Sequence, residues 1–241
     1  MRRRAASPRP RARLPRAQRV AQIMRCARTL FCERGFAATS TADIAAAAGV
    51  VEGTLYRYFP SKRDLLVKVI ENFYEHILAD YERQLQGVRG TWNRLRFLIW
   101  KHLSVMHDEP EMCRLIVHEL RPSPQYRRSR VFNLNRRYTE RTLAVVKEGM
   151  DAGELRRDIP LHVLRDLIFG CAEHHTWAYL RGEGQFSPDV SADAITDLIY
   201  RGLTRASSAA AVAGPVQRLE QAVERLEGLT TSRRTRRAAV S

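Results

Sequence analysis

A short stretch of the chain, residues 52–62, combines side chains that can recognise DNA bases with a backbone site that can bind phosphate. The residues that can meet base edges are Glu52, Gly53, Thr54, Arg57 and Tyr58. An arginine can donate two hydrogen bonds to guanine, and a carboxylate can accept one from the amino group of cytosine. Ser61 and Lys62 follow at an expected helix start, where free backbone N–H groups favour phosphate.

A second group of residues could serve acid–base catalysis or metal binding. It consists of Glu173, His174 and His175, with His102, His107 and His118 elsewhere in the chain. Adjacent residues of a helix point about 100° apart, so His174 and His175 do not easily bind one metal ion. The sequence contains no HExxH motif, glycine-rich phosphate loop or nucleophile elbow. We therefore expect no catalytic residue, no metal and no cofactor.

The net charge of +15 is concentrated at one end of the sequence and in both tails. Residues 1–16 contain seven arginines and no acid, and residues 233–237 contain four arginines. Residues 17–62 add a net charge of +3, which leaves the rest of the chain nearly neutral. This distribution favours a polyanion contacted from one end, although basic tails can also be merely solvated.

The four cysteines have irregular spacing and form no CxxC pair, which predicts reduced thiols. The chain has no apolar run long enough to span a bilayer, and it lacks the apolar segment of a signal peptide. We therefore expect a cytoplasmic protein without a membrane partner.

Helical periodicity predicts the helices that must position the candidate residues between 41 and 62. Apolar residues from Val20 to Phe31 repeat at helical spacing, and Gly35 is expected to end that helix. Ser40 and Asp43 form a capping box before a short helix over 41–48, and Ser61 with Asp64 forms another before a long helix. Between them, residues 52–58 form a third short helix, and such a helix-turn-helix places its second short helix in a major groove.

The same periodicity continues to residue 205, without sustained alternation typical of strands. We therefore predict an all-α fold of about nine helices. The expected parts are a disordered basic arm over 1–15, a helix-turn-helix head over 16–66, and a helical ligand-binding and dimerisation domain over 67–205. Residues 206–241 are expected to form a flexible linker, a possible short helix and a basic tail.

The motif around the short helices resembles the DNA-binding domain of the TetR family of transcriptional regulators. The resemblance rests on Gly53 to Leu66 (GTLYRYFPSKRDLL), on Thr39 to Val50 (TSxxDIAxxAGV), and on Phe31-x-x-x-Gly35-Phe36. It implies a homodimer on a palindromic operator, and a small-molecule effector in the C-terminal domain. The positions that it implies face DNA are Thr41, Glu52, Gly53, Thr54, Tyr56, Arg57, Tyr58 and Lys62.

Two of these positions leave questions that the sequence keeps open. Val51 and Glu52 depart from the residues common in the family, and an acid at position 52 repels phosphate. Tyr56 either contacts DNA or packs inside the head with Phe59.

A rival interpretation for the whole chain is an architectural DNA-binding protein without an effector.

Aromatic and polar residues on expected buried faces are the candidates for ligand binding, with core packing as the alternative. They are Trp100, Met106, Tyr138, Thr142, His174, His175 and Trp177. The last two helices, about 160–181 and 189–204, are expected to pair with their copies in a four-helix dimer interface. A loose likeness at residues 121–124 and 168–170 to TetR regulators of fatty-acid metabolism suggests an acyl-CoA effector, and regulation of drug efflux is the competing hypothesis.

Overall fold

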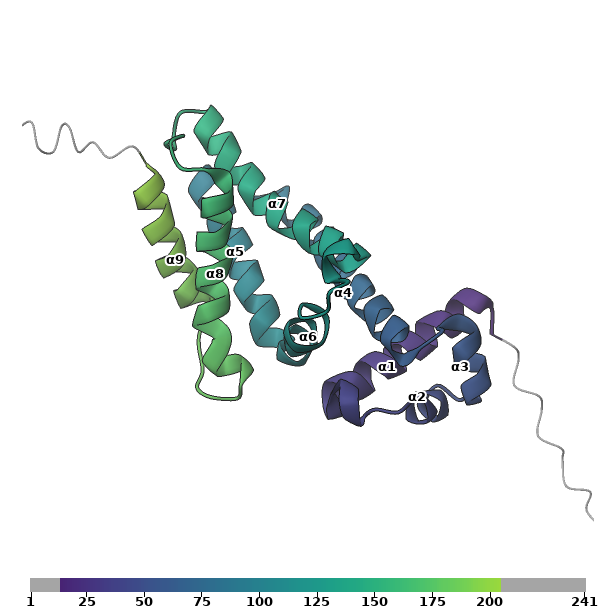
Figure 1. The fold of residues 1–241 in the computed structure, drawn as a ribbon. Coiled ribbons are helices and arrows are strands. Elements are labelled where there is room, and N and C mark those ends of the chain that lie inside the picture. Colours follow the sequence, from purple (N-terminus) through teal and green to yellow (C-terminus); the bar gives the residue numbers. More distant parts are fainter. Residues whose placement is uncertain (1–13, 205–241) are drawn as a thin grey trace, which may run out of the picture.

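Residues 14–204 are described by a computed structural model and form an all-helical fold (Figure 1). Within this range there are nine α-helices, one π-helical turn and one 3₁₀ turn, which confirms the predicted fold class. The elements are α1 (Arg16–Ala38), α2 (Thr41–Ala47), α3 (Glu52–Tyr58), α4 (Lys62–Leu85), α5 (Thr91–Asp108), α6 (Pro110–Leu115), η1 (Ile116–Leu120), η2 (Tyr126–Arg128), α7 (Arg130–Asp151), α8 (Leu161–Leu180) and α9 (Pro188–Leu203).

The head forms where the caps in the sequence predict it. The Ser40 side chain accepts a hydrogen bond from the Asp43 backbone N–H, and the Asp43 carboxylate accepts one from the Ser40 N–H. Ile44 and Leu55 bury one side of α2 and of α3 in a shared core. Gly35 was expected to end the first helix, but its φ of 80° produces a kink there, and another helical turn follows, so that α1 extends to Ala38.

Helix α4 connects the head to the second domain without a break (Figure 1). Its first turns pack against α1, and its later turns pack against α7 and α5. Leu65 and Leu66 are fully buried in the head, whereas Tyr74 and Tyr81 are buried in the second domain. The boundary that we predicted at residue 66 therefore lies inside one continuous helix.

The second domain is organised around α5. Helices α7, α8 and α9 all pack on α5, and α4 closes the bundle on the side of α7. These helices pack on α5 because it has an apolar face that includes Leu95, Ile99 and Leu103, all of which are buried. Helix α9 is tied to the end of α7 by a short bridge between Leu155 and Thr204.

The segment α6–η1 lies between the head and the second domain. Pro110 opens α6, where a missing backbone N–H costs nothing, and α6 packs against α1. The helical spacing of Met112, Leu115, Ile116 and Leu120 predicts one short helix, whereas the structure changes to a π-helical turn at Ile116. The predicted arm over 1–15 falls almost entirely outside the described residues, and the predicted linker, short helix and tail over 206–241 lie wholly outside them.

No helix within residues 14–204 combines the length and the apolar character needed to cross a membrane.

Candidate functional site

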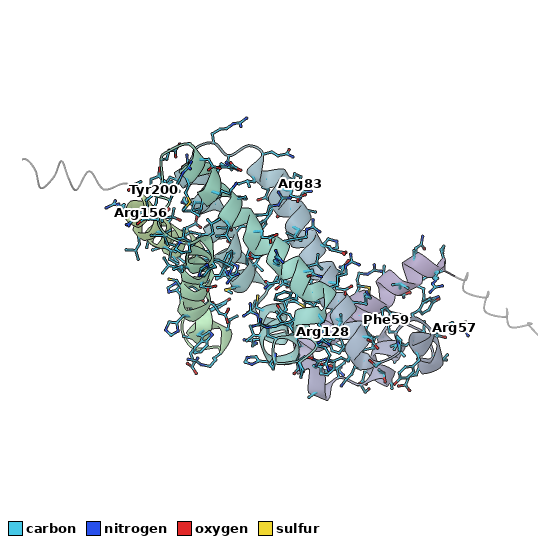
Figure 2. The ribbon with its side chains drawn as sticks, turned by 45° about the horizontal axis from the view of Figure 1, so that its top comes forward. Arg57, Phe59, Arg83, Arg128, Arg156 and Tyr200 are labelled. Carbon is cyan, nitrogen blue, oxygen red and sulfur yellow. The ribbon has the colours of Figure 1, made fainter. Side chains whose placement is uncertain are left out.

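Helix α3 is held by one buried side and presents the rest of its surface. Leu55 and, just after the helix, Phe59 are buried, whereas Glu52, Gly53 and Arg57 are exposed. Figure 2 shows Arg57 at the outer end of the head, far from Tyr200 on α9. The Arg57 guanidinium has no ion pair or hydrogen bond within residues 14–204, and Thr54 lies half-buried beside it on the helix. The exposed side of α3 can therefore enter a major groove.

A hydrogen-bonded cluster joins the start of α2 to the start of α3. The Thr41 hydroxyl donates to Glu52 Oε1 at 2.5 Å, and Thr41 Oγ1 lies 3.1 Å from the Tyr56 hydroxyl. Tyr56 is 47% exposed, so the alternative in which it packs inside the head with Phe59 is wrong. The cluster brings three of the expected DNA-facing residues together on the surface, and it holds the Glu52 carboxylate in an intramolecular hydrogen bond.

Tyr58 lies at the end of α3, half-buried against the head core. The Arg16 guanidinium lies over its ring, 5.7 Å from the centroid. This contact places the start of α1 beside the end of α3.

Lys62 lies at the start of α4, but its side chain bonds the end of α1. Its Nζ donates to the carbonyl oxygens of Phe36 at 2.8 Å and Thr39 at 2.9 Å, and it lies 4.4 Å from the centroid of the Phe36 ring. These contacts satisfy carbonyls that a helix end leaves without partners. A phosphate contact by this ammonium stays a prediction, and it would compete with three existing contacts.

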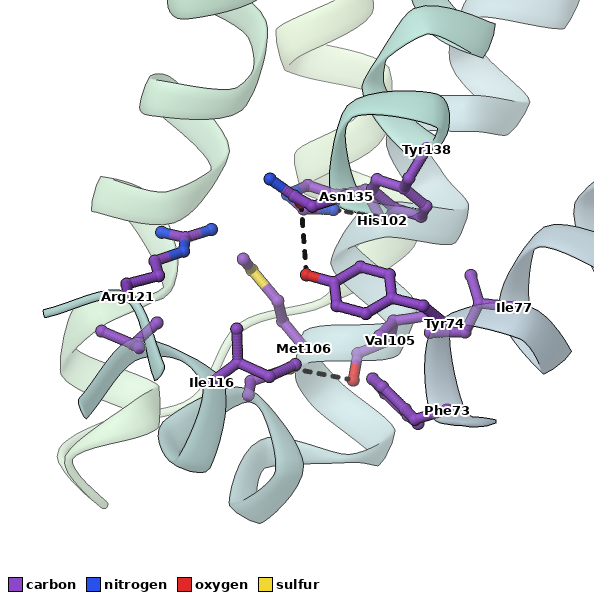
Figure 3. A pocket seen from close by; sticks show the side chains of 12 residues that line it. Phe73, Tyr74, Ile77, His102, Val105, Met106, Ile116, Arg121, Asn135 and Tyr138 are labelled. Atoms are coloured by element: carbon purple, nitrogen blue, oxygen red, sulfur yellow. Dashed lines mark hydrogen bonds between the residues drawn. The ribbon is translucent and has the colours of Figure 1, made fainter. Parts of the chain in front are cut away.

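A small cavity of about 50 Å³ lies in the second domain between five elements and Arg121 (Figure 3). Its lining residues are Phe73, Tyr74 and Ile77 from α4, His102, Val105 and Met106 from α5, Cys113, Ile116 and Val117 from α6–η1, Arg121, and Asn135 and Tyr138 from α7. Most of these side chains are apolar, so the cavity suits a hydrocarbon group.

A few polar groups interrupt the apolar lining. The Tyr138 hydroxyl lies 2.7 Å from His102 Nδ1 and 2.6 Å from the hydroxyl of Tyr81. Burial, with a smaller contribution from the Arg121 charge, lowers the pKa of His102 to about 4, so the imidazole is neutral. At the edge of the cavity, Arg121 is paired with Glu173 at 2.7 Å, which neutralises its charge.

The cavity contains only two of the seven residues that we predicted for ligand binding, Met106 and Tyr138. Thr142 is buried and Trp100 is half-buried, and neither lines this cavity. The expectation that His174, His175 and Trp177 lie on a buried face is wrong. The inward face of α8 is made by Leu164, Ile168, Ala172 and Thr176, so those three residues point elsewhere and are exposed.

Trp177 and His174 form a separate aromatic pair on the surface, with ring centroids 5.5 Å apart. His175 instead bonds across to α9, where its Nε2 lies 2.8 Å from the Ser191 hydroxyl. A role of these residues in ligand binding stays a prediction.

Sequence reasoning missed most of the cavity. Phe73 and Ile77 belong to the apolar stripe of α4, and nothing in that stripe separates a cavity wall from ordinary core. His102 carried a signal, because it lies three residues after Ile99 and four before Met106 on the apolar face of α5. Arg121 carried none, because it follows the end of η1 among polar residues.

Two ion pairs join the α6–η1 region to the head. Arg28 of α1 bonds the Glu109 carboxylate at 2.5 Å, and Arg63 of α4 lies 3.7 Å from the Glu119 carboxylate. The Arg63 guanidinium also donates to the backbone carbonyl of Glu119. Since Cys113 and Ile116 of the same segment line the cavity, this segment touches both the cavity and the head.

The outer sides of α8 and α9 form an exposed apolar face. Leu167 is 51% exposed and Leu198 is 75% exposed, and an apolar groove of about 240 Å³ lies between the two helices. A Cβ built at Gly170 or Gly202 would meet no atom within 4 Å, so both positions are open to close approach. This face has the character of an interface between proteins.

Comparisons with known proteins match both parts of the chain. Residues 23–69 match the family model described as bacterial regulatory proteins of the tetR family, and residues 89–203 match the tetracyclin repressor-like C-terminal domain. The "Fatty acid metabolism regulator protein" of Bacillus subtilis is 22% identical over 182 residues, which cover 76% of this chain and 94% of that protein. The repressor KstR2 of Mycobacterium tuberculosis is 25% identical over 161 residues, which cover 66% of this chain and 78% of that protein.

The fold is also that of a solved relative. The crystal structure of FadR from Bacillus subtilis in complex with stearoyl-CoA has a TM-score of 0.67 with this chain, at 22% identity, and covers 76% of this chain and 98% of that one.

Proposed function

The chain belongs to the TetR family of bacterial regulatory proteins and is a DNA-binding transcription regulator, and we propose that it is a repressor released from its operator by a small amphipathic ligand. The observation that carries this proposal is that α4 and α6–η1 line the cavity and also pack against α1 of the head. A ligand that changes the cavity walls must act on elements that also position the head.

The head binds a major groove through the exposed side of α3. Arg57 reads a base edge, and Thr41 and Tyr56 approach from the cluster at the start of α2 and α3. Two copies bind a palindromic operator, with their α3 helices one helical turn of DNA apart, roughly 34–36 Å.

The two copies meet through the apolar face of α8 and α9. Leu167 and Leu198 would be buried when this face packs on its copy, and the open positions at Gly170 and Gly202 permit close helix contact. Ala178, another small residue of α8, is also exposed, which suits the same role.

The effector is an acyl-CoA thioester whose hydrocarbon part enters the cavity. The apolar lining supports this choice, and so does the stearoyl-CoA complex of the Bacillus subtilis relative. At about 50 Å³ the cavity holds only a fraction of such a chain, so binding requires the walls to separate. That separation is the physical link between ligand and head, because the walls include α4 and α6–η1.

The test is a pair of titrations with an operator selected from random DNA by this protein. Stearoyl-CoA is expected to reduce operator binding, and by reciprocity the operator must reduce stearoyl-CoA affinity by the same factor. CoA without an acyl chain serves as the control and is expected to change nothing.

Other outcomes would identify the competing hypotheses. Release by lipophilic drugs but not by stearoyl-CoA would favour a regulator of drug efflux. Binding to DNA without sequence preference at any salt concentration would favour an architectural protein. Equal stearoyl-CoA affinity with and without operator would refute release by ligand.

A further inference from the structure

A chain of hydrogen bonds leads from the core of the second domain to the cavity. It runs from the Tyr81 hydroxyl to the Tyr138 hydroxyl at 2.6 Å and on to His102 Nδ1 at 2.7 Å. Tyr81 is 2% exposed and Tyr138 is 5% exposed, so water does not compete for their hydroxyls. The other ring nitrogen, His102 Nε2, is buried and has no partner among residues 14–204.

The position of each hydrogen in this chain follows from counting donors. The neutral imidazole carries one hydrogen, and each tyrosine hydroxyl carries one. If Tyr81 donates to Tyr138 and Tyr138 donates to Nδ1, the ring hydrogen is on Nε2 and only that N–H lacks a partner.

The opposite direction satisfies fewer groups. If Nδ1 donates to Tyr138 and Tyr138 donates to Tyr81, then the Tyr81 hydrogen has no acceptor, because its one hydrogen bond in the described chain is to Tyr138. The Nε2 lone pair is then also without a donor. Buried polar groups without partners are costly, so the first direction is favoured.

We infer that His102 donates its Nε2 hydrogen to a carbonyl oxygen of the effector, and that this bond selects ligands with a neutral acceptor next to hydrocarbon. The inference rests on the proposed function, since it assumes that the effector occupies this cavity. His102 lines the cavity among Val105, Met106 and other apolar side chains (Figure 3).

A neutral acceptor is favoured over a carboxylate because of the charges nearby. Arg121 is the one cationic side chain of the lining, and it is already paired with Glu173. A buried carboxylate would therefore lack a free counter-charge, and its desolvation would oppose binding. The chemical class is an acyl thioester, ester or amide rather than a free fatty acid.

The experiment compares stearoyl-CoA with S-octadecyl-CoA, a thioether that replaces the carbonyl by a methylene group. In the wild-type protein we expect the thioester to bind about tenfold more tightly than the thioether. One hydrogen bond to a buried donor is enough to produce a difference of that size. In His102→Phe, which keeps an aromatic ring against Phe169, the ratio should fall toward one.

Tyrosine variants test the direction in which the hydrogen bonds between Tyr81, Tyr138 and His102 are donated. Tyr81→Phe removes the donor that fixes the ring hydrogen on Nε2, so the thioester preference should decrease although the His102 ring remains. Tyr179→Phe is the matched control, because its hydroxyl bonds the His107 carbonyl outside the cavity, and it should keep the wild-type ratio.

A ¹⁵N NMR spectrum of the histidine rings gives a direct reading, with the His102 signals assigned by their loss in His102→Phe. The hydrogen is expected on Nε2, and a hydrogen on Nδ1 would overturn the inference without any ligand. Equal binding of thioester and thioether would also overturn it, while the proposed function would stand. Binding of neither compound would instead refute the acyl-CoA proposal, and the inference with it.

Discussion

Replacing Lys62 by methionine is expected to destabilise the head rather than to remove a phosphate contact. Methionine keeps the apolar stem of the side chain and deletes the ammonium that bonds the carbonyls of Phe36 and Thr39. The substitution therefore distinguishes two roles of Lys62. One is structural, the bonding of carbonyls at the end of α1, and the other is the phosphate contact that the sequence alone suggests.

The magnitude follows from the contacts of Nζ. A hydrogen bond to a charged group contributes about 1.5–3 kcal/mol, and a cation over an exposed aromatic ring contributes about 0.5–1 kcal/mol. Lys62 and Phe36 are half-buried, so water can reach the space left by the ammonium and offset part of this sum, although Thr39 is only 1% exposed. We expect the free energy of unfolding to fall by about 2 kcal/mol, which lowers the urea midpoint by about 1 M.

Two measurements distinguish the roles of Lys62. Urea unfolding gives the stability, and the slope of log K for operator binding against log salt counts phosphate contacts. Lys147→Met is the control, because Lys147 is an exposed lysine in a surface ion pair and should change stability by less than about 0.5 kcal/mol. Unchanged stability of Lys62→Met, with a salt slope smaller by about 0.9, would refute our reasoning and restore the phosphate contact.

Four further predictions concern other parts of the protein. Arg57→Ala should weaken operator binding by about 1–3 kcal/mol and relax specificity at one base pair, whereas uniform loss would indicate a phosphate contact. Stability should fall by about 3 kcal/mol as pH drops from 6.5 to about 4, because only the unfolded chain protonates His102 there, and His102→Phe should remove this loss. Leu198→Glu should yield monomers in light scattering, and persistent dimers would exclude the α8–α9 interface. Deleting residues 1–15 should reduce the salt slope by about 0.9 per lost phosphate contact, while an unchanged slope would mean that the arm is only solvated.

The sequence predicts the head well because its signals are local. Ser40 with Asp43 marks the start of α2, and the predicted span of α3 agrees with the observed Glu52–Tyr58. These boundaries depend on residues within a turn of each other. The partner of Lys62 depends instead on how the end of α1 meets the start of α4, and no local pattern contains that information.

The predicted burial of His174, His175 and Trp177 on α8 is wrong for a different reason. Its apolar residues cover two sides, since Ile168 packs into the core whereas Leu167 is exposed on the outer face. A helix with two apolar sides has no unique inward direction in its sequence, so the sequence does not show that His174 and Trp177 face solvent. The cavity was missed because it needs side chains from α4, α5, α6–η1 and α7 to converge, which only the packed structure defines.

The uninterrupted course of α4 sets the size of the motion that a ligand can produce at the DNA. Its 24 residues form a rod about 36 Å long. Tyr74, in the cavity wall, lies 12 residues from Lys62, or about 18 Å along that rod. A tilt of about 5° pivoting at Tyr74 moves the start of α4 by roughly 1.5 Å, with no hinge to absorb it. In a dimer the two displacements would add or cancel according to the two-fold axis, so the direction of tilt determines whether the half-site spacing changes.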